Sequence, residues 1–449
     1  MHDQWLAAGI VLIALATLIV GLRICSQRFG WQPETVRKAL HIGMGTVALT
    51  FPWIFTGPWP VFALAGVALG LLLALRRVPA LKTSFGSVID SVDRVSAGEL
   101  YFPVGIALSF WLTDGDPLLY GVPILILTLA DAVAALIGIR YGTKRYATLD
   151  GTKSYQGSLA FFGMAFACTF VPLMLFPRTG VPEAVLIAVI IGVLTMLVEA
   201  VAWRGLDNLL LPVIGFLLLD SFLKLDVGEL LTNLAAIVLL CIITFLYRAR
   251  STLADDALLT AVLVGYIIWA LGGFIWLYPP LVIFLRDKLI SYSALGPDIS
   301  RHNVQSILTI CIPGLIWLVA AVVSGQGGLF YPYVLSFAIH LSILELTREI
   351  YHYPSRSRLT AFLSSVGVGW LMFIPFFFIT HFGQPWLLLG LVGAGPIALG
   401  VSLFMVVQPG IDHCPRDLSR WLRQGASAFA ASAAGLLLLW LTRSYHGHG

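Results

Sequence analysis

The chain has 449 residues, of which 59% are hydrophobic and only 11% are charged. A soluble domain carries about 25% charged residues, so this composition excludes an ordinary soluble protein and predicts a membrane protein. The net charge of +4 is small and the five cysteines are scattered, so we expect no nucleic-acid partner, no zinc site and no disulfide framework.

Apolar runs follow one another along the whole chain. A membrane-spanning helix needs about 20 apolar residues, and the sequence contains about sixteen such runs, some of them short. The first, at about residues 5–22, lacks the basic region and the small-residue cleavage site of a signal peptide, so we interpret it as a retained anchor. The predicted fold class is an all-α polytopic membrane protein with about 16 transmembrane helices, arranged in two halves of about eight.

Lysine and arginine residues concentrate in every second loop, and the loops between them are short and nearly free of these residues. The basic loops cover residues 23–38, 76–94, 140–153, 204, 248–250, 286–301, 348–358 and 416–423. By the positive-inside rule these loops face the cytoplasm, and both termini lie on the opposite side. We therefore expect an integral multi-pass protein of a bacterial inner membrane, with its active face on the cytoplasmic side.

The second half of the chain matches the first half weakly. Trp111 and Trp317, like Arg94 and Arg301, are separated by nearly the same number of residues. Such spacing is typical of internal repeats in membrane folds, but matches this sparse also arise by chance. A duplication is therefore left open.

Residues 131–157 carry the most unusual pattern in the chain. Asp131 lies near the end of a long apolar run, and Ala134, Gly138 and Gly142 follow it on the same face of a helix. Small residues let a second helix, or the phosphates of a ligand, come close to the backbone. Basic residues follow within the same stretch. A membrane carboxylate beside a small-residue face and a basic loop suggests a metal–phosphate site.

Further polar motifs flank this stretch in a definite order. They are Arg37-Lys38-x-x-His41, Gly98-Glu99-Leu-Tyr-Phe-Pro103, Lys153-Ser154-x-Gln156-Gly157-Ser158, and Glu199 followed by Gly205-Leu-Asp207-Asn208 and Pro212. Together with the Asp131 pattern, these motifs span about residues 34–220. Their order and spacing resemble the CTP-dependent polyprenol kinase family, which includes dolichol kinase and phytol kinase and is related to the phosphatidate cytidylyltransferases.

The resemblance implies that the protein phosphorylates a long-chain isoprenoid alcohol of the phytol, geranylgeraniol or polyprenol class. It implies CTP as the phosphoryl donor, bound by residues 131–157, and Mg²⁺ as the cofactor. The sequence departs from the dolichol branch at Thr152 and Gln156, where that branch has a basic and an acidic residue, and is closer to the phytol branch. The implied partners are a membrane lipid and a nucleotide, and a homodimer is left open.

Phosphoryl transfer needs positive charge at the phosphates and an oriented hydroxyl, and the residue types suggest roles. The catalytic candidates are Asp131, Lys153, His41 and Lys38. The candidates for holding the nucleotide are Ala134, Gly138, Gly142, Ser154, Gly157, Arg94 and Glu99. The metal-ligand candidates are Asp131, Glu199, Asp207 and Asn208. Mg²⁺ usually takes one or two carboxylates together with phosphate oxygens, which is why acidic residues dominate the last group.

Plainer interpretations stand beside these roles. Asp131 can be an intramembrane ion-pair partner, the glycine face can serve helix packing, and Arg94 with Glu99 can form a structural salt bridge. For the whole chain, the alternatives are a cytidylyltransferase that forms a CDP-lipid and a transporter built of two halves. The polar candidates gather at one membrane face, which favours an enzyme that meets a cytosolic nucleotide.

The motifs end near residue 220. We therefore predict a catalytic prenol-kinase-like membrane domain over residues 1–225 and a second, non-catalytic membrane domain over residues 226–449. The polar residues His340, Glu345, Asp412 and His413 of the second domain are expected to be structural or solvated rather than catalytic. A weaker similarity of residues 272–280 to the membrane family that contains phytyl-phosphate kinase leaves a two-step fusion open.

Overall fold

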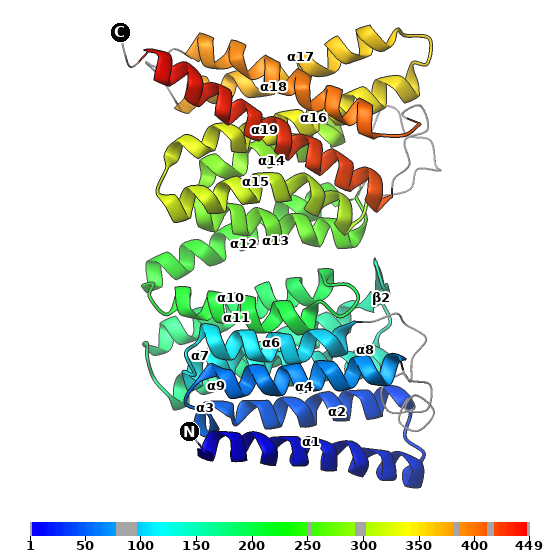
Figure 1. Cartoon of the computed structure of the whole chain (residues 1–449), viewed down its shortest axis with the longest axis vertical. Helices are drawn as coiled ribbons and strands as arrows, with labels where there is room; N and C mark the ends of the chain where they lie inside the picture. The colour runs from blue at the N-terminus through cyan, green and yellow to red at the C-terminus, as the bar shows by residue number, and fades with distance from the viewer. Residues whose placement is uncertain are drawn as a thin grey trace. The chain divides into compact units, whose positions relative to one another are not determined.

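The computed structural model describes residues 2–77, 97–248, 253–291, 302–380, 386–410 and 417–446, and within these ranges it is almost entirely helical (Figure 1). The chain forms two compact units, with unit 1 over Met1–Ala236 and unit 2 over Ile237–Gly449. The catalytic and non-catalytic roles expected for the two halves stay predictions.

Unit 1 contains α1 (His2–Phe29), α2 (Pro33–Leu49), α3 (Phe51–Ile54), α4 (Pro58–Arg77), α6 (Gly98–Leu112), α7 (Pro117–Leu125), the π-helical turn η1 (Ile126–Ala130), α8 (Asp131–Tyr141), β1 (Arg145–Thr148), β2 (Gly151–Ser154), α9 (Tyr155–Leu175), α10 (Val181–Val201) and α11 (Asp207–Phe222). The helix α12 (Val227–Arg248) crosses the boundary between the units. Unit 2 contains α13 (Asp255–Gly272), α14 (Phe274–Ser291), α15 (Val304–Ser324), the 3₁₀ turn η2 (Gly327–Leu329), α16 (Phe330–His352), α17 (Arg358–Thr380), α18 (Trp386–Val407) and α19 (Leu418–His446).

Many of these helices have the length and composition of membrane spans. Within the described ranges, nine are long and apolar enough to cross a bilayer: Gln4–Phe29, Pro117–Tyr141, Tyr155–Leu175, Val181–Val201, Val227–Leu246, Asp255–Gly272, Val304–Ser324, Gly327–His352 and Leu418–Leu441. Four shorter apolar helices are Pro58–Ala74, Gly98–Leu112, Phe274–Arg286 and Val392–Val407. The all-α fold class is confirmed and a multi-pass membrane protein is indicated, whereas sixteen spans stays a prediction.

The span Pro117–Tyr141 is built from α7, η1 and α8 in succession. It begins at Asp116, whose carboxylate accepts hydrogen bonds from the backbone N–H groups of Leu118 and Leu119 at 3.0 and 2.9 Å. An N-cap of this kind followed by proline is a strong helix start. Five residues in the middle, Ile126–Ala130, adopt π-helical geometry, and Asp131 follows them directly. Single π turns inside α-helices are rare and are frequent at functional sites.

The helices α1, α2 and α4 are joined by short connections, which makes successive helices antiparallel. α1 packs against both α2 and α4. A Cβ at Gly43 of α2 would lie 2.8 Å from a methyl carbon of Leu18 of α1, so this glycine permits the close approach of the two helices. Val36 and Leu40 form a small apolar cluster with Leu18 and its neighbours on α1.

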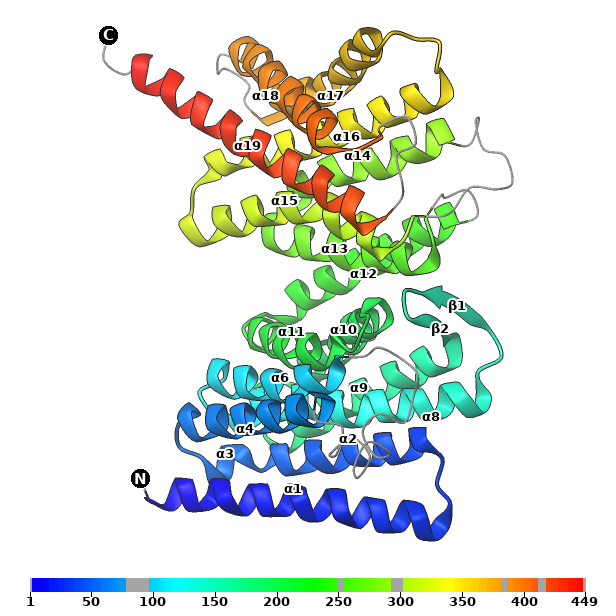
Figure 2. The same ribbon diagram turned by 45° about the vertical axis from the view of Figure 1, so that its right-hand side comes forward.

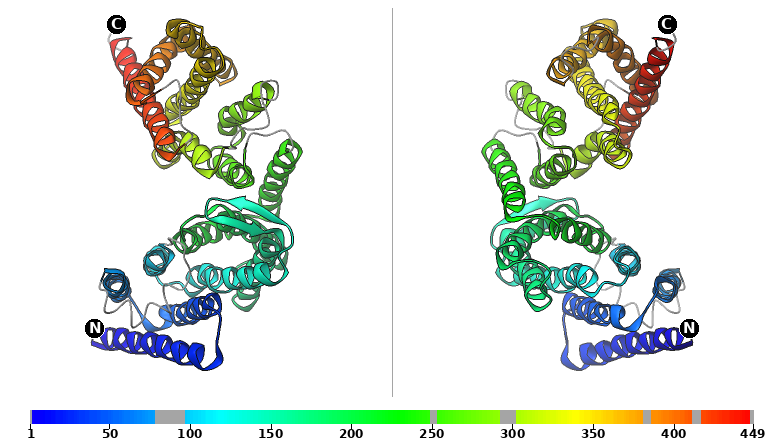
Figure 3. Two further views of the ribbon diagram at one scale, coloured as in Figure 1. Left: turned by 90° about the vertical axis from the view of Figure 1, so that its right-hand side faces the viewer. Right: turned by 90° about the vertical axis from the view of Figure 1, so that its left-hand side faces the viewer.

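The polar segment between the Asp131 pattern and the next helix contains a β-hairpin, which was not predicted from the sequence. β1 pairs antiparallel with β2, with Tyr146 opposite Lys153 (Figure 2). Tyr146 is buried, and its hydroxyl lies 2.8 Å from Ser158 Oγ. The hairpin, drawn as two teal arrows in Figure 3, is connected directly to α9. Each strand has only four residues, which is too short for an alternation of apolar and polar residues to reveal it in the sequence.

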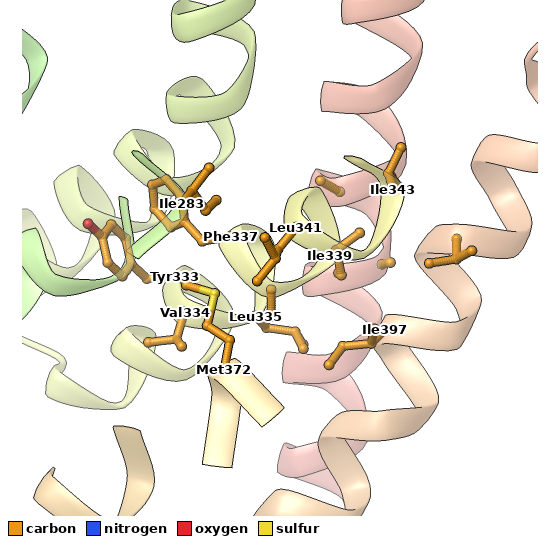
Figure 4. Packing of buried hydrophobic residues seen from close by; sticks show 14 of the residues in the cluster. Ile283, Tyr333, Val334, Leu335, Phe337, Ile339, Leu341, Ile343, Met372 and Ile397 are labelled. Carbon is orange, nitrogen blue, oxygen red and sulfur yellow. The ribbon is translucent and has the colours of Figure 1, made fainter. Parts of the chain in front are cut away.

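Unit 2 is organised around α16. In the most apolar stretch of 18 residues within its span, 89% of the residues are buried, and α14, α15, α17, α18 and α19 pack around it. Figure 4 shows Tyr333, Phe337 and Ile339 of α16 in this core, with Ile397 of α18 nearby. A helix that is buried on nearly all sides, as α16 is, forms the centre of a helical bundle.

Two of the polar residues expected to be structural in unit 2 are buried on α16. The ring of His340 is fully buried, and its Nδ1 lies 3.1 Å from Nε2 of Gln424. Glu345 pairs with Arg348 at 2.7 Å and with Arg286. The other two, Asp412 and His413, lie outside the described residues.

We expect Glu345→Ala to destabilise unit 2, because both guanidinium groups lose a carboxylate that is only 4% exposed. Removing one member of a buried ion pair costs about 3 kcal/mol, and this should lower the thermal unfolding midpoint measured in detergent. The matched control is Asp220→Ala, which breaks the exposed Asp220–Lys224 pair and should cost less than about 1 kcal/mol. Equal midpoints for the two variants would contradict the structural role of Glu345.

Candidate active site

A cavity of about 960 Å³ lies inside unit 1. Ligand pockets generally enclose about 300–1,000 Å³, so this cavity is large. The predicted site residues that line it are Lys38, His41, Glu99, Asp131, Ala134, Gly138, Lys153, Ser154, Gly157, Glu199, Asp207 and Asn208. Gly142 is not among the lining residues, and Arg94 lies outside the described residues. The structure thus brings together most of the candidates, although they are spread over more than half of unit 1.

Lys38 and Asp131 form a buried ion pair in the cavity wall. Lys38 Nζ lies 2.6 Å from Asp131 Oδ2, and the two side chains are only 7% and 13% exposed. The pair joins α2 to the first residue of α8. An uncompensated buried charge costs several kcal/mol, so each of these groups requires the other.

His41 lies beside this pair, one turn further along α2. Its Nε2 is 3.7 Å from Asp131 Oδ2 and 2.9 Å from the carbonyl oxygen of Leu127. A carbonyl oxygen can only accept a hydrogen bond, so Nε2 carries the proton of the neutral ring and Nδ1 is its basic nitrogen. The ring is further oriented by an edge-on contact with Phe102, with centroids 5.2 Å apart.

The π turn η1 explains why a backbone carbonyl is available to His41. A π turn replaces the regular i→i−4 hydrogen bonds by i→i−5 hydrogen bonds and so changes the direction of its carbonyl groups. Leu127 lies within this turn. A Cβ at Gly45 would lie only 2.8 Å from Thr128 Cβ, so this glycine lets α2 approach the π turn. The close approach brings His41 within reach of the Leu127 carbonyl.

Lys153 and Glu199 form a second ion pair. Lys153 Nζ lies 2.8 Å from Glu199 Oε1 and also donates to the backbone carbonyl of Glu199. Burial opposes the positive charge on Lys153, but the carboxylates of Glu199 and Asp207 outweigh it and raise the pKa of the amine. The ammonium group is therefore held in its charged form. It connects β2 to the last turn of α10.

Asp207 and Asn208 begin α11, after a tight turn in which Arg204 and Gly205 have φ values of 53° and 81°. Asn208 Nδ2 donates to the carbonyl oxygen of Gly98 at 3.0 Å and so ties α11 to α6. Within the described part of the chain, the Asp207 carboxylate forms neither a hydrogen bond nor an ion pair. Because it also lines the cavity, it is a carboxylate that a cation could bind.

The small-residue face of α8 packs against the start of α9. A Cβ at Gly142 would lie 2.7 Å from Ser154 Cβ, and one at Gly157 would lie 3.0 Å from the Ala134 carbonyl oxygen. Ser154 caps α9 by accepting a hydrogen bond from the Gly157 N–H at 3.1 Å. The plainer interpretation of these glycines as packing residues thus has direct support. Because Gly138 and Gly157 also line the cavity, contact with a ligand stays a prediction.

The proposed metal ligands do not form a preassembled site. Within the ranges that the structure describes, no three histidine, cysteine, aspartate or glutamate side chains are grouped closely enough to hold a metal ion. Asp131 and Glu199 are already paired with lysines. A Mg²⁺ ion could still be held by Asp207 together with phosphate oxygens, since Mg²⁺ usually takes only one or two protein carboxylates.

Several residues of the site were not found from the sequence. The cavity wall includes Arg145 and Asp150 of the hairpin and Arg204 of the turn before α11. The Asp150 carboxylate accepts a hydrogen bond from the backbone N–H of Arg204, which joins these two segments. The departure from the family pattern at Gln156 falls outside the wall, and its amide donates to Thr143 Oγ1 at 2.6 Å. Gln156 thus has a local structural role.

The fold and the site define a membrane-type helical protein in which two buried lysine–carboxylate pairs face one cavity. The chain is 29% identical to the phytol kinase of Synechocystis sp. (strain ATCC 27184 / PCC 6803 / Kazusa) over 214 residues, which cover 46% of this chain and 88% of that protein. The chain is thus a distant homologue of phytol kinase, and the predicted resemblance is confirmed. No family model matches the chain. No solved structure matches it.

We expect Gly157→Ala to lower the thermal unfolding midpoint, because its Cβ would press on the Ala134 carbonyl and on Ser154 Oγ, both 3.0 Å away. The matched control is Gly163→Ala on the same helix, where a Cβ would meet no atom within 4 Å. Alanine there should raise stability by up to about 1 kcal/mol, because glycine is a poor helix former. A Gly157→Ala protein as stable as the Gly163→Ala protein would show that the two helices are not packed tightly at this point.

Proposed function

We propose that the protein transfers the γ-phosphoryl group of CTP to the hydroxyl of a long-chain isoprenoid alcohol. The observation that carries this proposal is that one wall of the cavity is charged and the other is apolar. Its polar wall contains Lys38, Lys153 and Asp207, whereas the parts of α1, α4 and the second half of α2 that line it are apolar. Such a cavity suits a reaction between a charged phosphate donor and a lipid alcohol.

The reaction forms a bond between the alcohol oxygen and the γ-phosphorus and breaks the bond from that phosphorus to the β,γ-bridging oxygen. The products are a prenyl monophosphate and CDP. Lys38 and Lys153 neutralise phosphate oxygens, and their paired carboxylates hold the two amino groups in the cavity wall. A bound Mg²⁺ would polarise the transferred group. The choice of CTP rests on the distant homology with phytol kinase.

The alcohol proton needs an acceptor, and His41 is suitably placed beside the Lys38–Asp131 pair. Its Nε2–H is directed at the Leu127 carbonyl, so Nδ1 is the nitrogen that would take the proton. The π turn thus fixes which tautomer is presented to the substrate. Asp131 lies close enough to stabilise the imidazolium that results.

The position of the site also supports an enzyme. Asp131 lies within the span Pro117–Tyr141, whereas Lys38 and Asp207 lie near the N-terminal ends of α2 and α11 and Glu199 lies at the C-terminal end of α10. We propose that these helix ends face the cytoplasm of a bacterial cell, where a soluble nucleotide is available. A transporter site is expected near the bilayer midplane. Unit 2 is proposed to be non-catalytic.

Transfer of label tests the function directly. Protein in detergent would receive Mg²⁺, CTP labelled at the γ position, and phytol, geranylgeraniol or a long polyprenol in separate reactions. We expect γ-label in the lipid fraction with release of CDP. A parallel reaction with α-labelled CTP and a prenyl phosphate detects a cytidylyltransferase, which would place α-label in the lipid and release pyrophosphate. That outcome, or the absence of transfer to every lipid, would contradict a kinase.

Asp207→Asn tests the metal role with the least structural disturbance, because the carboxylate has no protein partner to lose among the described residues. We expect kcat to fall by about 100-fold and the Mg²⁺ concentration for half-maximal rate to rise, with an unchanged thermal midpoint. Asp131→Asn also abolishes transfer by our proposal, but it leaves Lys38 without its counter-charge. Asp220→Asn, on the same helix and outside the cavity, is the control. Unaltered Mg²⁺ dependence in Asp207→Asn would remove this residue from the site.

A further inference from the structure

The apolar part of the cavity runs along α2 from His41 towards Phe51. Val11 of α1 and Val61 of α4 line it together with Phe51, and these three side chains are 4%, 1% and 6% exposed. A buried apolar wall of this kind, continuous with a charged site, fits the hydrocarbon tail of a substrate whose head group reacts at the charges.

The antiparallel arrangement of the helices places these three residues at the same end. α1 and α2 meet at Leu18 and Gly43, so Val11, about two turns earlier in α1, lies towards the C-terminal end of α2. α4 begins shortly after α3, so Val61 near its start lies towards that end as well. Lys38 lies in the first half of α2, at the opposite end. The cavity therefore has a charged end and an apolar end.

The apolar end is closed by a firm aromatic cluster. The rings of Phe51 and Phe55 meet edge to face with centroids 5.2 Å apart, and Phe55 is only 2% exposed. Behind them the hydroxyl of Tyr120 donates to the Ala48 carbonyl oxygen at 3.1 Å. The Tyr120 ring in turn packs on Phe110 at 5.6 Å. Close-packed aromatic side chains of this kind resist displacement, so the end wall has a fixed position.

The length of the apolar part can be estimated from the helix. From Lys38 to Phe51 the backbone advances by roughly 20 Å, at about 1.5 Å per residue. With C–C bonds of about 1.5 Å, an extended chain of about four isoprene units covers a comparable distance. A chain of about three units would leave the end wall uncontacted, and a much longer chain would run into Phe51.

We propose that Phe51 ends a chain-length ruler that selects isoprenoid alcohols of about four isoprene units. This inference rests on the proposed function, because it assumes that the hydroxyl is held at Lys38, Asp131 and His41. Val61 and Val11 form the side walls of the ruler at the same depth. Each methylene that fits an apolar pocket contributes about tenfold or more to discrimination, so a fixed end wall gives a sharp preference.

The test measures kcat/KM for alcohols of about two, three, four and nine isoprene units in the wild type and three variants. In Phe51→Ala, the kcat/KM for the longest alcohol divided by that for the four-unit alcohol should rise by about tenfold or more. Val61→Phe should lower the rate with the four-unit alcohol by a similar factor and spare the shortest one. Trp53→Ala is the matched control, because Trp53 lies in the same helix as Phe51, is 69% exposed and does not line the cavity. Its profile should equal that of the wild type.

Binding of the tritiated alcohols, measured without nucleotide, separates the ruler from the kinase activity. Length-dependent binding that shifts in Phe51→Ala without any phosphoryl transfer would refute the kinase and support the ruler. Transfer with the wild-type length profile in both Phe51→Ala and Val61→Phe would refute the ruler and leave the kinase intact. If Val61→Phe does not fold, the Phe51→Ala profile alone decides, because removing a side chain opens space rather than filling it.

Discussion

Charge placed inside an apolar helical protein has to be compensated, and this constraint shapes unit 1. Lys38 meets Asp131 and Lys153 meets Glu199, each pair with short contacts and little exposure. Each pair joins elements that are far apart in the sequence, α2 with α8 and the hairpin with α10. Burying either partner alone would be strongly unfavourable. The pairs therefore hold together the elements that build the cavity, and they fix two lysine side chains in its wall.

The remaining features of the site follow from how closely the elements approach each other. Glycines at positions 45, 142 and 157 remove side chains where α2 meets the π turn and where α8 meets the start of α9. Asn208 ties α11 to α6, which places Asp207 in the cavity wall. As a result, the Asp207 carboxylate has no protein partner among the described residues, whereas the carboxylates of Asp131 and Glu199 are each paired with a lysine. The site thus combines fixed charges with one group available to a cation.

The sequence allowed part of this site to be predicted. Asp131, Lys38, Lys153 and Glu199 stand out because a charged residue is conspicuous in or beside an apolar run, and the structure places them in one cavity. Which lysine meets which carboxylate depends on tertiary packing and could not be predicted. The π turn has no signature in the letters Ile-Leu-Thr-Leu-Ala, and the hairpin strands are too short for their alternation to be recognised. The glycine face was compatible with packing or with a ligand, and only the positions of Ser154 and Ala134 show the packing contact.

The π turn also determines the rotational phase of the span that carries Asp131. An α-helix turns by about 100° per residue, and a π turn accommodates one additional residue because its hydrogen bonds join residues five apart rather than four apart. Residues 117–125 and 131–141 are therefore offset from each other by about one residue step around a common axis. If residues 126–130 were regular α-helix, Asp131 and the glycines would be turned away from Lys38 and from α9 while the residues before the turn stayed in place. The five residues of the π turn thus rotate the second half of the span about its axis relative to the first half. The first half can then face the protein core while the second half faces the proposed reaction site.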